Sequence, residues 1–195
     1  MAFIRTVAED EAQGETAEIY TQAQATYGYV PNMTKIFSHR PEVMKAWTAL
    51  AGVVRSNMEL RRYELATLAA AKALTSSYCM LAHGSLMLRE ICSVDALKAI
   101  VVQADDAPIS PAEQAIMRFA VQIARDATSV TADDIDGLRG LGLSDAEIFD
   151  VASAAAIRCF FSKMLDALGA LPDRAYAEIE PELRESLMVG RPIEG

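Results

Sequence analysis

The residues whose types and spacing favour chemistry lie in one stretch, ELATLAAAKALTSSYCMLAH, which spans residues 64–83. It holds one of the two histidines and one of the three cysteines of the chain. Cys79 and His83 are four residues apart, so on a helix they share a face and lie within side-chain reach of each other. A thiol beside an imidazole base predicts a reactive cysteine.

Glu64 is the candidate for a carboxylate that orients the imidazole of His83. It lies twelve residues before Ser76, on the helix that precedes Cys79. It returns to the same site if the two helices pack antiparallel around a break at residues 75–77. The alternative is structural, because an acid in the first turn of a helix interacts favourably with the helix dipole.

Cys79 is expected in the first turn of its own helix, with Ser76 or Ser77 as the N-cap. Free backbone N–H groups and the positive end of the helix dipole would stabilise a thiolate there. Ser76 is also a candidate hydrogen-bond donor to that thiolate or to a substrate. The structural alternatives are a buried, inert cysteine and a serine that only caps the helix.

Apolar spacings of three and four predict an all-α fold, and no strand-like alternation of useful length appears. The helix that carries Glu64 is apolar almost all round, so it should be central. Proline and capping residues mark helix starts at 111 and 144, residues 104–110 suggest a loop, and a turn is expected at 27–33. The expected helices span residues 10–26, 42–58, 61–75, 78–91, 94–103, from 111 onward, 131–140 and 144–168.

The chain is interpreted as a single all-helical domain, 1–195, with the core motif at 61–92, a second helical half at about 111–170 and a C-terminal tail at 171–195. A weak internal match relates the two halves. It sets Glu64 opposite Glu147, Ser76 opposite Cys159, Cys79 opposite Ser162, and His83 opposite Asp166. Only the first half therefore keeps a thiol and a base together.

Composition narrows the class of protein further. The net charge of -9, with no basic tract, argues against nucleic-acid and anionic-membrane partners. The N-terminus has no apolar core of a secretory signal, and charged residues interrupt every long apolar run. Three widely spaced cysteines do not form a disulfide framework. These features predict a soluble, cytoplasmic protein with reduced thiols.

Glu64 followed by SSYCMLAH, together with YGYVPN and SHRPEV, resembles the alkylhydroperoxidase D and carboxymuconolactone decarboxylase-like superfamily, especially its peroxidase-related branch. The family pattern is a glutamate followed by Cys-x-x-Cys-x-x-x-His. Glu64, Cys79 and His83 match the glutamate, the second cysteine and the histidine, whereas Ser76 replaces the first cysteine. Tyr78 occupies the place of an additional histidine found in some members.

The resemblance implies an AhpD-like helical fold without cofactor or metal, assembled as a homo-oligomer (dimer, trimer or hexamer). It also implies an antioxidant, thiol-dependent peroxidase. Because Ser76 removes the partner of a disulfide, Cys79 would react alone with a small-molecule peroxide and be restored by a thiol reductant or reductant protein. Cys92, about 20 Å along the same helix, is too far to serve as that thiol; the sequence does not place Cys159.

Two other hypotheses remain. In a carboxymuconolactone decarboxylase-like enzyme, Glu64 and His83 would perform acid–base chemistry without a thiol, and an arginine would hold an anionic substrate. Arg61, Arg62 and Arg89 are the candidates by proximity in the sequence. In a non-catalytic helical oligomer, loss of the first cysteine would have removed the activity. The substrate, the reductant and the oligomer number are open at this point.

Overall fold

Ten α-helices make up the regular structure in a computed structural model that describes residues 2–102 and 106–195, and no strand occurs in these ranges. The all-α expectation is confirmed. The α-helices are α1 (Gly14–Tyr27), α2 (Asn32–Ile36), α3 (Pro41–Ser56), α4 (Leu60–Ala73), α5 (Ser77–Glu90), α6 (Val94–Val102), α7 (Pro111–Asp126), α8 (Ala132–Gly140), α9 (Asp145–Ala167) and α10 (Pro181–Leu187). Short 3-10 helices occupy Phe37–His39, Ala127–Ser129 and Arg174–Glu178.

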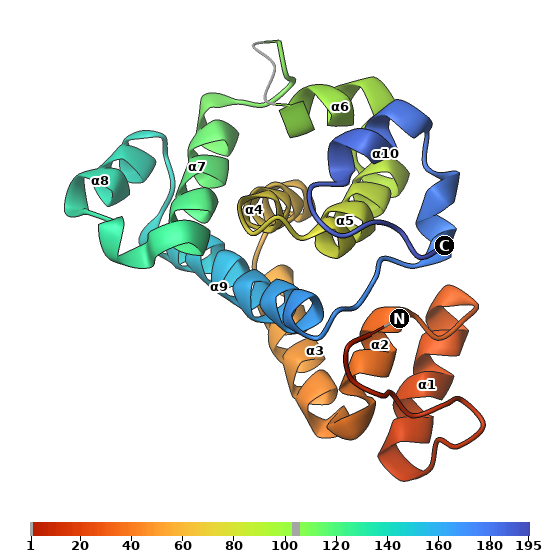
Figure 1. Ribbon diagram of the computed structural model, residues 1–195. Helices are drawn as coiled ribbons and strands as arrows, with labels where there is room; N and C mark the ends of the chain where they lie inside the picture. The colour runs from red at the N-terminus through yellow and green to blue at the C-terminus, as the bar shows by residue number, and fades with distance from the viewer. Residues whose placement is uncertain (1, 103–105) are drawn as a thin grey trace.

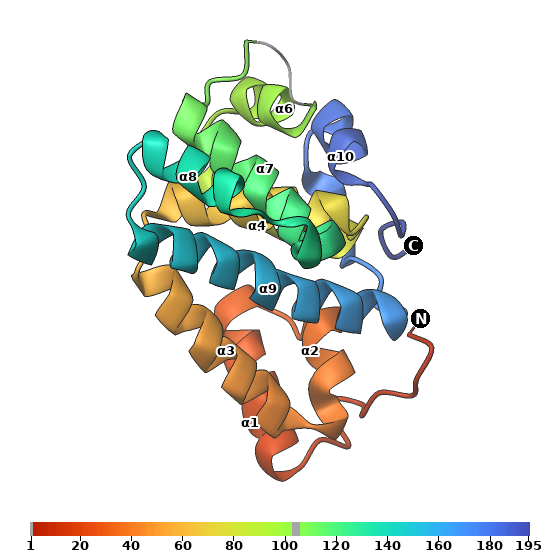
Figure 2. The same ribbon diagram turned by 90° about the vertical axis from the view of Figure 1, so that its left-hand side faces the viewer.

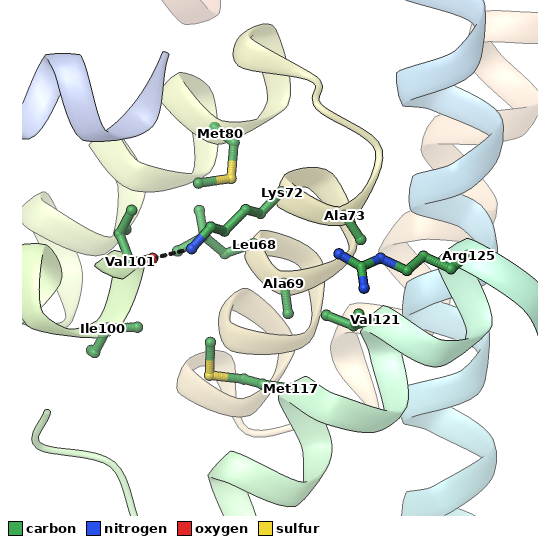
Figure 3. Close-up of a pocket in the computed structure, with 10 residues that line it drawn as sticks. All are labelled: Leu68, Ala69, Lys72, Ala73, Met80, Ile100, Val101, Met117, Val121 and Arg125. Carbon is green, nitrogen blue, oxygen red and sulfur yellow. Dashed lines mark hydrogen bonds between the residues drawn. The ribbon is translucent and has the colours of Figure 1, made fainter. Parts of the chain in front are cut away.

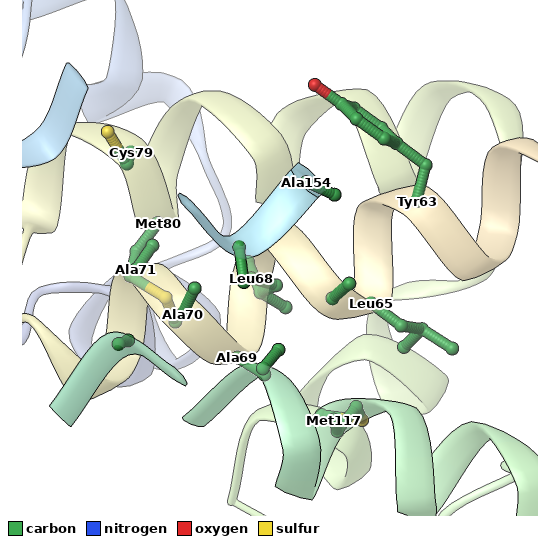
Figure 4. Close-up of a cluster of buried hydrophobic side chains, with 14 of the residues drawn as sticks. Tyr63, Leu65, Leu68, Ala69, Ala70, Ala71, Cys79, Met80, Met117 and Ala154 are labelled. Atoms are coloured by element: carbon green, nitrogen blue, oxygen red, sulfur yellow. The ribbon is translucent and has the colours of Figure 1, made fainter. Parts of the chain in front are cut away.

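Helix α4 is the centre of the molecule, as its all-round apolar sequence predicts. Every residue from 63 to 71 is buried, and α5, α7 and α9 pack around the helix (Figure 1). Leu68 of α4, Met80 of α5, Met117 of α7 and Ala154 of α9 meet in the same apolar cluster (Figure 4). Because every residue of this stretch is buried, the side chain of Glu64 also points into the protein.

Helix α9 lies across the fold, with α3 on one side and α4 and α7 on the other (Figure 2). Trp47 of α3 stacks on Phe161 of α9 with ring centroids 4.0 Å apart, and Phe37 stacks on the same ring at 5.6 Å. Stacked aromatic pairs of this kind stabilise packing beyond the area that they bury. They fix the face that α9 presents toward α5.

The connection between α4 and α5 is a tight break that turns the chain back antiparallel. Thr75 adopts φ 55, the left-handed region that side chains other than glycine rarely occupy. Ser76 is the N-cap residue of α5, as expected, but its side chain makes no capping hydrogen bond. Ser77 instead accepts a hydrogen bond from the backbone N–H of Gly190 at 2.7 Å.

Several boundaries differ from the expectation. Helix α4 begins at Leu60, so Glu64 lies in its second turn and the dipole explanation for Glu64 is wrong. Helix α2 and the 3-10 helix after it had not been predicted, because two short elements leave no periodic pattern. Gln103 of the expected helix 94–103 and residues 104 and 105 of the expected loop lie outside the described residues.

Candidate active site

Glu64 and His83 face each other across the antiparallel pair α4 and α5. Glu64 Oε2 lies 2.6 Å from His83 Nδ1, and the Glu64 side chain is only 1% exposed. Burial, then the positive charge of Arg158, lowers the pKa of His83, and Glu64 acts against this shift. The imidazole is therefore neutral near pH 7, with Nδ1–H donating to Glu64 and Nε2 left as a base.

The sulfur of Cys79 accepts hydrogen bonds from two side chains of α9. Ser162 Oγ donates to Cys79 Sγ at 3.1 Å, and Arg158 Nη1 donates to it at 3.5 Å. Arg158 and Ser162 are four residues apart, so one face of α9 presents both donors. Cys79 itself is 1% exposed. The thiol thus lies in a closed environment with two side-chain hydrogen-bond donors.

Arg158 is a candidate site residue that was not among the residues expected from the sequence. It is 2% exposed, and its guanidinium lies over the rings of Trp47 at 5.8 Å and Phe161 at 5.6 Å. Its Nε has no hydrogen-bond partner, and within residues 2–102 and 106–195 no carboxylate forms an ion pair with it. A buried charge without a counter-ion costs several kcal/mol. The Cys79 sulfur is among the groups that contact this guanidinium.

One signal in the sequence pointed to Arg158: a single arginine within the apolar run AAAIRCFF of α9. A charged residue in such a run is almost never fully buried unless it has a partner. Arg61, Arg62 and Arg89, which proximity suggested instead, bind glutamates elsewhere: Glu113 at 2.5 Å, Glu147 at 2.9 Å and Glu90 at 2.7 Å, respectively.

Ser76, Cys92 and Cys159 make no hydrogen bond to the Cys79 sulfur within residues 2–102 and 106–195. Ser76 is fully buried, and its hydroxyl has no hydrogen-bond partner in the described part of the chain; the contact proposed for it is made by Ser162. Cys92 and Cys159 are free, half-buried thiols, and burial raises the pKa of each. Neither is activated by its surroundings.

Tyr78, next to Cys79, anchors the start of α5. Its hydroxyl donates to a carboxylate oxygen of Asp173 and accepts from the backbone N–H of Met33 at 3.0 Å. The backbone N–H of Asn32 donates to the other Asp173 oxygen at 2.7 Å. Burial raises the pKa of Asp173 and raises the pKa of Tyr29 to about 12, with Asp173 as a second cause. This network connects the YGYVPN segment to α5 through Asp173.

Two classes of feature are missing from residues 2–102 and 106–195. No helix there is long and apolar enough to cross a membrane. No three side chains of His, Cys, Asp or Glu gather there in an arrangement that would hold a metal ion.

The fold is similar to several solved structures. A peroxidase-related protein from Ralstonia eutropha, with the alkylhydroperoxidase AhpD core, is 21% identical at a TM-score of 0.79, over 90% of this chain and 94% of that one. A peroxidase-related protein from Silicibacter sp. is 20% identical at 0.76, over 89% and 94%. The debrominase Bmp8, in complex with 2,3,4-tribromopyrrole, is 15% identical at 0.74, over 91% and 95%. These similarities define an AhpD-like helical fold.

Sequence comparison adds the family. The model of the carboxymuconolactone decarboxylase family matches residues 41–122, which include α4 and α5. No curated protein sequence matches the chain. Residues 41–122 are therefore similar to the carboxymuconolactone decarboxylase family, in the region where the motif around Glu64, Cys79 and His83 indicated a resemblance, and the whole chain has an AhpD-like helical fold.

Proposed function

We propose that the protein is a thiol-dependent peroxidase that uses Cys79 as its single redox-active cysteine. One observation carries the proposal: the Cys79 sulfur contacts Arg158, a buried cation without a carboxylate partner among the described residues. Ser162 donates a second hydrogen bond to the same sulfur. Both contacts are stronger when sulfur carries a negative charge, and the thiolate is the nucleophilic form of cysteine.

The reaction begins with transfer of the thiol proton to Nε2 of His83, which Glu64 holds in the required tautomer. The thiolate attacks the terminal oxygen of a hydroperoxide, so that an S–O bond forms while the O–O bond breaks. Sulfur is oxidised by two electrons to a sulfenic acid, and the peroxide is reduced. His83 returns its proton to the departing alkoxide, which leaves as an alcohol.

Recovery of Cys79 requires two equivalents of an external thiol. The first condenses with the sulfenic acid and releases water, and the second reduces the mixed disulfide that results. Ser76 cannot act as the resolving thiol, and Cys92 and Cys159 are the remaining internal thiols. This chemistry fits a reducing compartment such as the cytoplasm and an oligomer like those of the superfamily.

The decisive experiment follows peroxide consumption in the presence of excess small thiol. The wild-type protein should turn over an alkyl hydroperoxide, and its Cys79 peptide should gain one oxygen when the thiol is omitted. Cys79→Ser should reduce turnover to background, whereas the matched variant Cys159→Ser should retain it. A Cys79 thiol that peroxide leaves unmodified at neutral pH would falsify the proposal.

A second candidate function uses the same arginine differently. In a carboxymuconolactone decarboxylase-like enzyme, the guanidinium of Arg158 would hold a substrate carboxylate while Glu64 and His83 exchange protons with the substrate. The unpartnered Nε of Arg158 favours this alternative. The two functions separate cleanly, because acid–base activity would survive Cys79→Ser and peroxidase activity would not.

Haloaromatic compounds provide a further probe of the thiol. Debrominase Bmp8 shares the fold and has been observed with 2,3,4-tribromopyrrole. We propose to include that compound in the assay, with bromide release as the readout and the same pair of cysteine variants. Release that depends on Cys79 and exceeds peroxide turnover would identify a carbon–halogen bond as the preferred electrophile.

A further inference from the structure

A cavity of about 240 Å³ lies between α4, α5, α6 and α7 (Figure 3). Its wall is mostly aliphatic and includes two flexible methionine side chains from opposite sides, which adapt readily to the shape of a ligand. The apolar part of the wall is formed chiefly by Leu68, Met80, Ile100, Met117 and Val121.

Two cations complete the lining of this cavity. Lys72 extends from α4, and its Nζ donates to the carbonyl oxygen of Val101 at 2.5 Å. Arg125 extends from α7 toward Ala73 (Figure 3). Lys72 retains further N–H donors, and Arg125 contributes a planar guanidinium suited to bidentate contact with a carboxylate.

No acidic side chain of the part of the chain that the structure describes lines this cavity. Among the described residues, no carboxylate forms an ion pair with Lys72 or Arg125. Lys45, Lys98 and Arg139, in contrast, each bind two carboxylates. In a protein of net charge -9, an apolar cavity whose described lining includes two cations and no carboxylate is suited to an anionic ligand.

The volume limits the size of the ligand. Cavities of about 150 Å³ hold a benzene-sized molecule, and drug-sized ligands occupy roughly 300–1,000 Å³. We propose that this cavity binds a small amphipathic monocarboxylate, such as a single aromatic ring or a short alkyl chain with one carboxylate. The hydrocarbon part packs against the aliphatic wall and the carboxylate binds Arg125, while Lys72 adds a second positive charge to the lining.

This binding site is separate from the thiol. Met80 and Cys79 are adjacent on α5, but Met80 lines the cavity whereas Cys79 contacts Arg158 and Ser162 of α9. Successive residues of a helix point in directions about 100° apart. The cavity and the Cys79 sulfur therefore face different sides of α5, and carboxylate binding does not depend on the proposed peroxidase chemistry.

Binding of benzoate and hexanoate to the full chain tests the proposal, by calorimetry and by NMR shifts of the methionine methyl groups. Both carboxylates should move the Met80 and Met117 signals, and benzamide, which has the same ring without the charge, should bind at least tenfold more weakly. Preference for benzoate or for hexanoate identifies the aromatic or the aliphatic class.

Matched variants locate the carboxylate. Arg125→Gln should weaken benzoate binding about tenfold or more, because a charged hydrogen bond is lost. Arg118→Gln, which removes an exposed charge from the same helix away from the cavity, should leave it unchanged. Equal affinity in the two variants, equal binding of benzamide, or unmoved methionine signals would each overturn the proposal.

Discussion

The weak internal match aligns Glu64 with Glu147, and the structure places these two glutamates in different surroundings. Glu64 is buried and binds His83. Glu147 instead lies in the first turn of α9, accepts hydrogen bonds from the N-cap residue Ser144, and pairs with Arg62. The first half breaks into α4 and α5 at Thr75. The second half runs as one helix, Asp145–Ala167, through the corresponding positions.

The difference shows that the two halves contribute different side chains to the same candidate site. The α4–α5 half contains Cys79 and the Glu64–His83 pair, and α9 contains the two side chains that donate hydrogen bonds to the Cys79 sulfur. Cys79 contacts Ser162, the residue that the internal match sets opposite it.

The strongest test of this division moves the thiol to the other half. The double variant Cys79→Ser with Ser162→Cys keeps both atoms of the contact but places the sulfur on α9. Turnover of hydroperoxide should fall to background, because Asp166, held near Arg191, stands where a histidine would be needed. Circular dichroism controls for folding, and substantial turnover by the double variant would show that the two halves are interchangeable.

Removing the cation contributed by α9 should have the next largest effect. Arg158→Met keeps an apolar stem against Trp47 and Phe161 but eliminates the charge beside sulfur. The rate of Cys79 alkylation and of peroxide reduction should fall roughly 100-fold, the usual cost of one preorganised electrostatic contact. Arg118→Met is the control, and a change of less than about twofold would remove Arg158 from the mechanism.

The paired glutamates should separate activity from stability. Glu64→Gln preserves size but loses the carboxylate that orients His83, so turnover should fall at least tenfold, as expected when a general base is misplaced. Glu147→Gln weakens a helix cap and should lower the melting temperature by about 1–3 °C while turnover is retained. The comparison fails if both variants lose activity equally.

The smallest predicted effect concerns the titration of His83, which NMR can follow because the chain has only two histidines. Burial and Arg158 lower the pKa of His83 below its usual 6.5, so activity that needs neutral imidazole should decline only below pH 6.5. Arg158→Met removes a charge that disfavours imidazolium and should raise that pKa. A lower pKa in the variant would contradict this electrostatic account; His39 provides the reference signal.

Local pattern explains why much of the fold was predictable from the sequence. Spacings of three and four, with caps such as Ser110 and Ser144, located the principal helices, and a fully apolar α4 implied its central position. The Glu64–His83 pair followed from one assumption, an antiparallel turn at residues 75–77. These inferences depend on residues within one helix or one hairpin.

The rest of the site depends on packing between distant segments. Arg158 and Ser162 reach Cys79 only because α9 crosses α5, which no local pattern encodes. Ser76 and Ser162 illustrate this limit. Ser76 is close to Cys79 in the sequence, but its hydroxyl has no hydrogen-bond partner in the described part of the chain. Ser162 is distant in the sequence, yet its hydroxyl donates the hydrogen bond to the Cys79 sulfur. The catalytic roles of Glu64, Ser76, Cys79 and His83 stay predictions.

The position of Trp47 gives the molecule an intrinsic optical reporter. It is the only tryptophan in the chain; it stacks on Phe161 and lies beneath the guanidinium that contacts Cys79. Conversion of the sulfur from thiolate to sulfenic acid changes the charge that Arg158 faces, and with it the electric field on the indole. Fluorescence recorded in a stopped-flow instrument should therefore display each oxidation and reduction of Cys79 without any added dye.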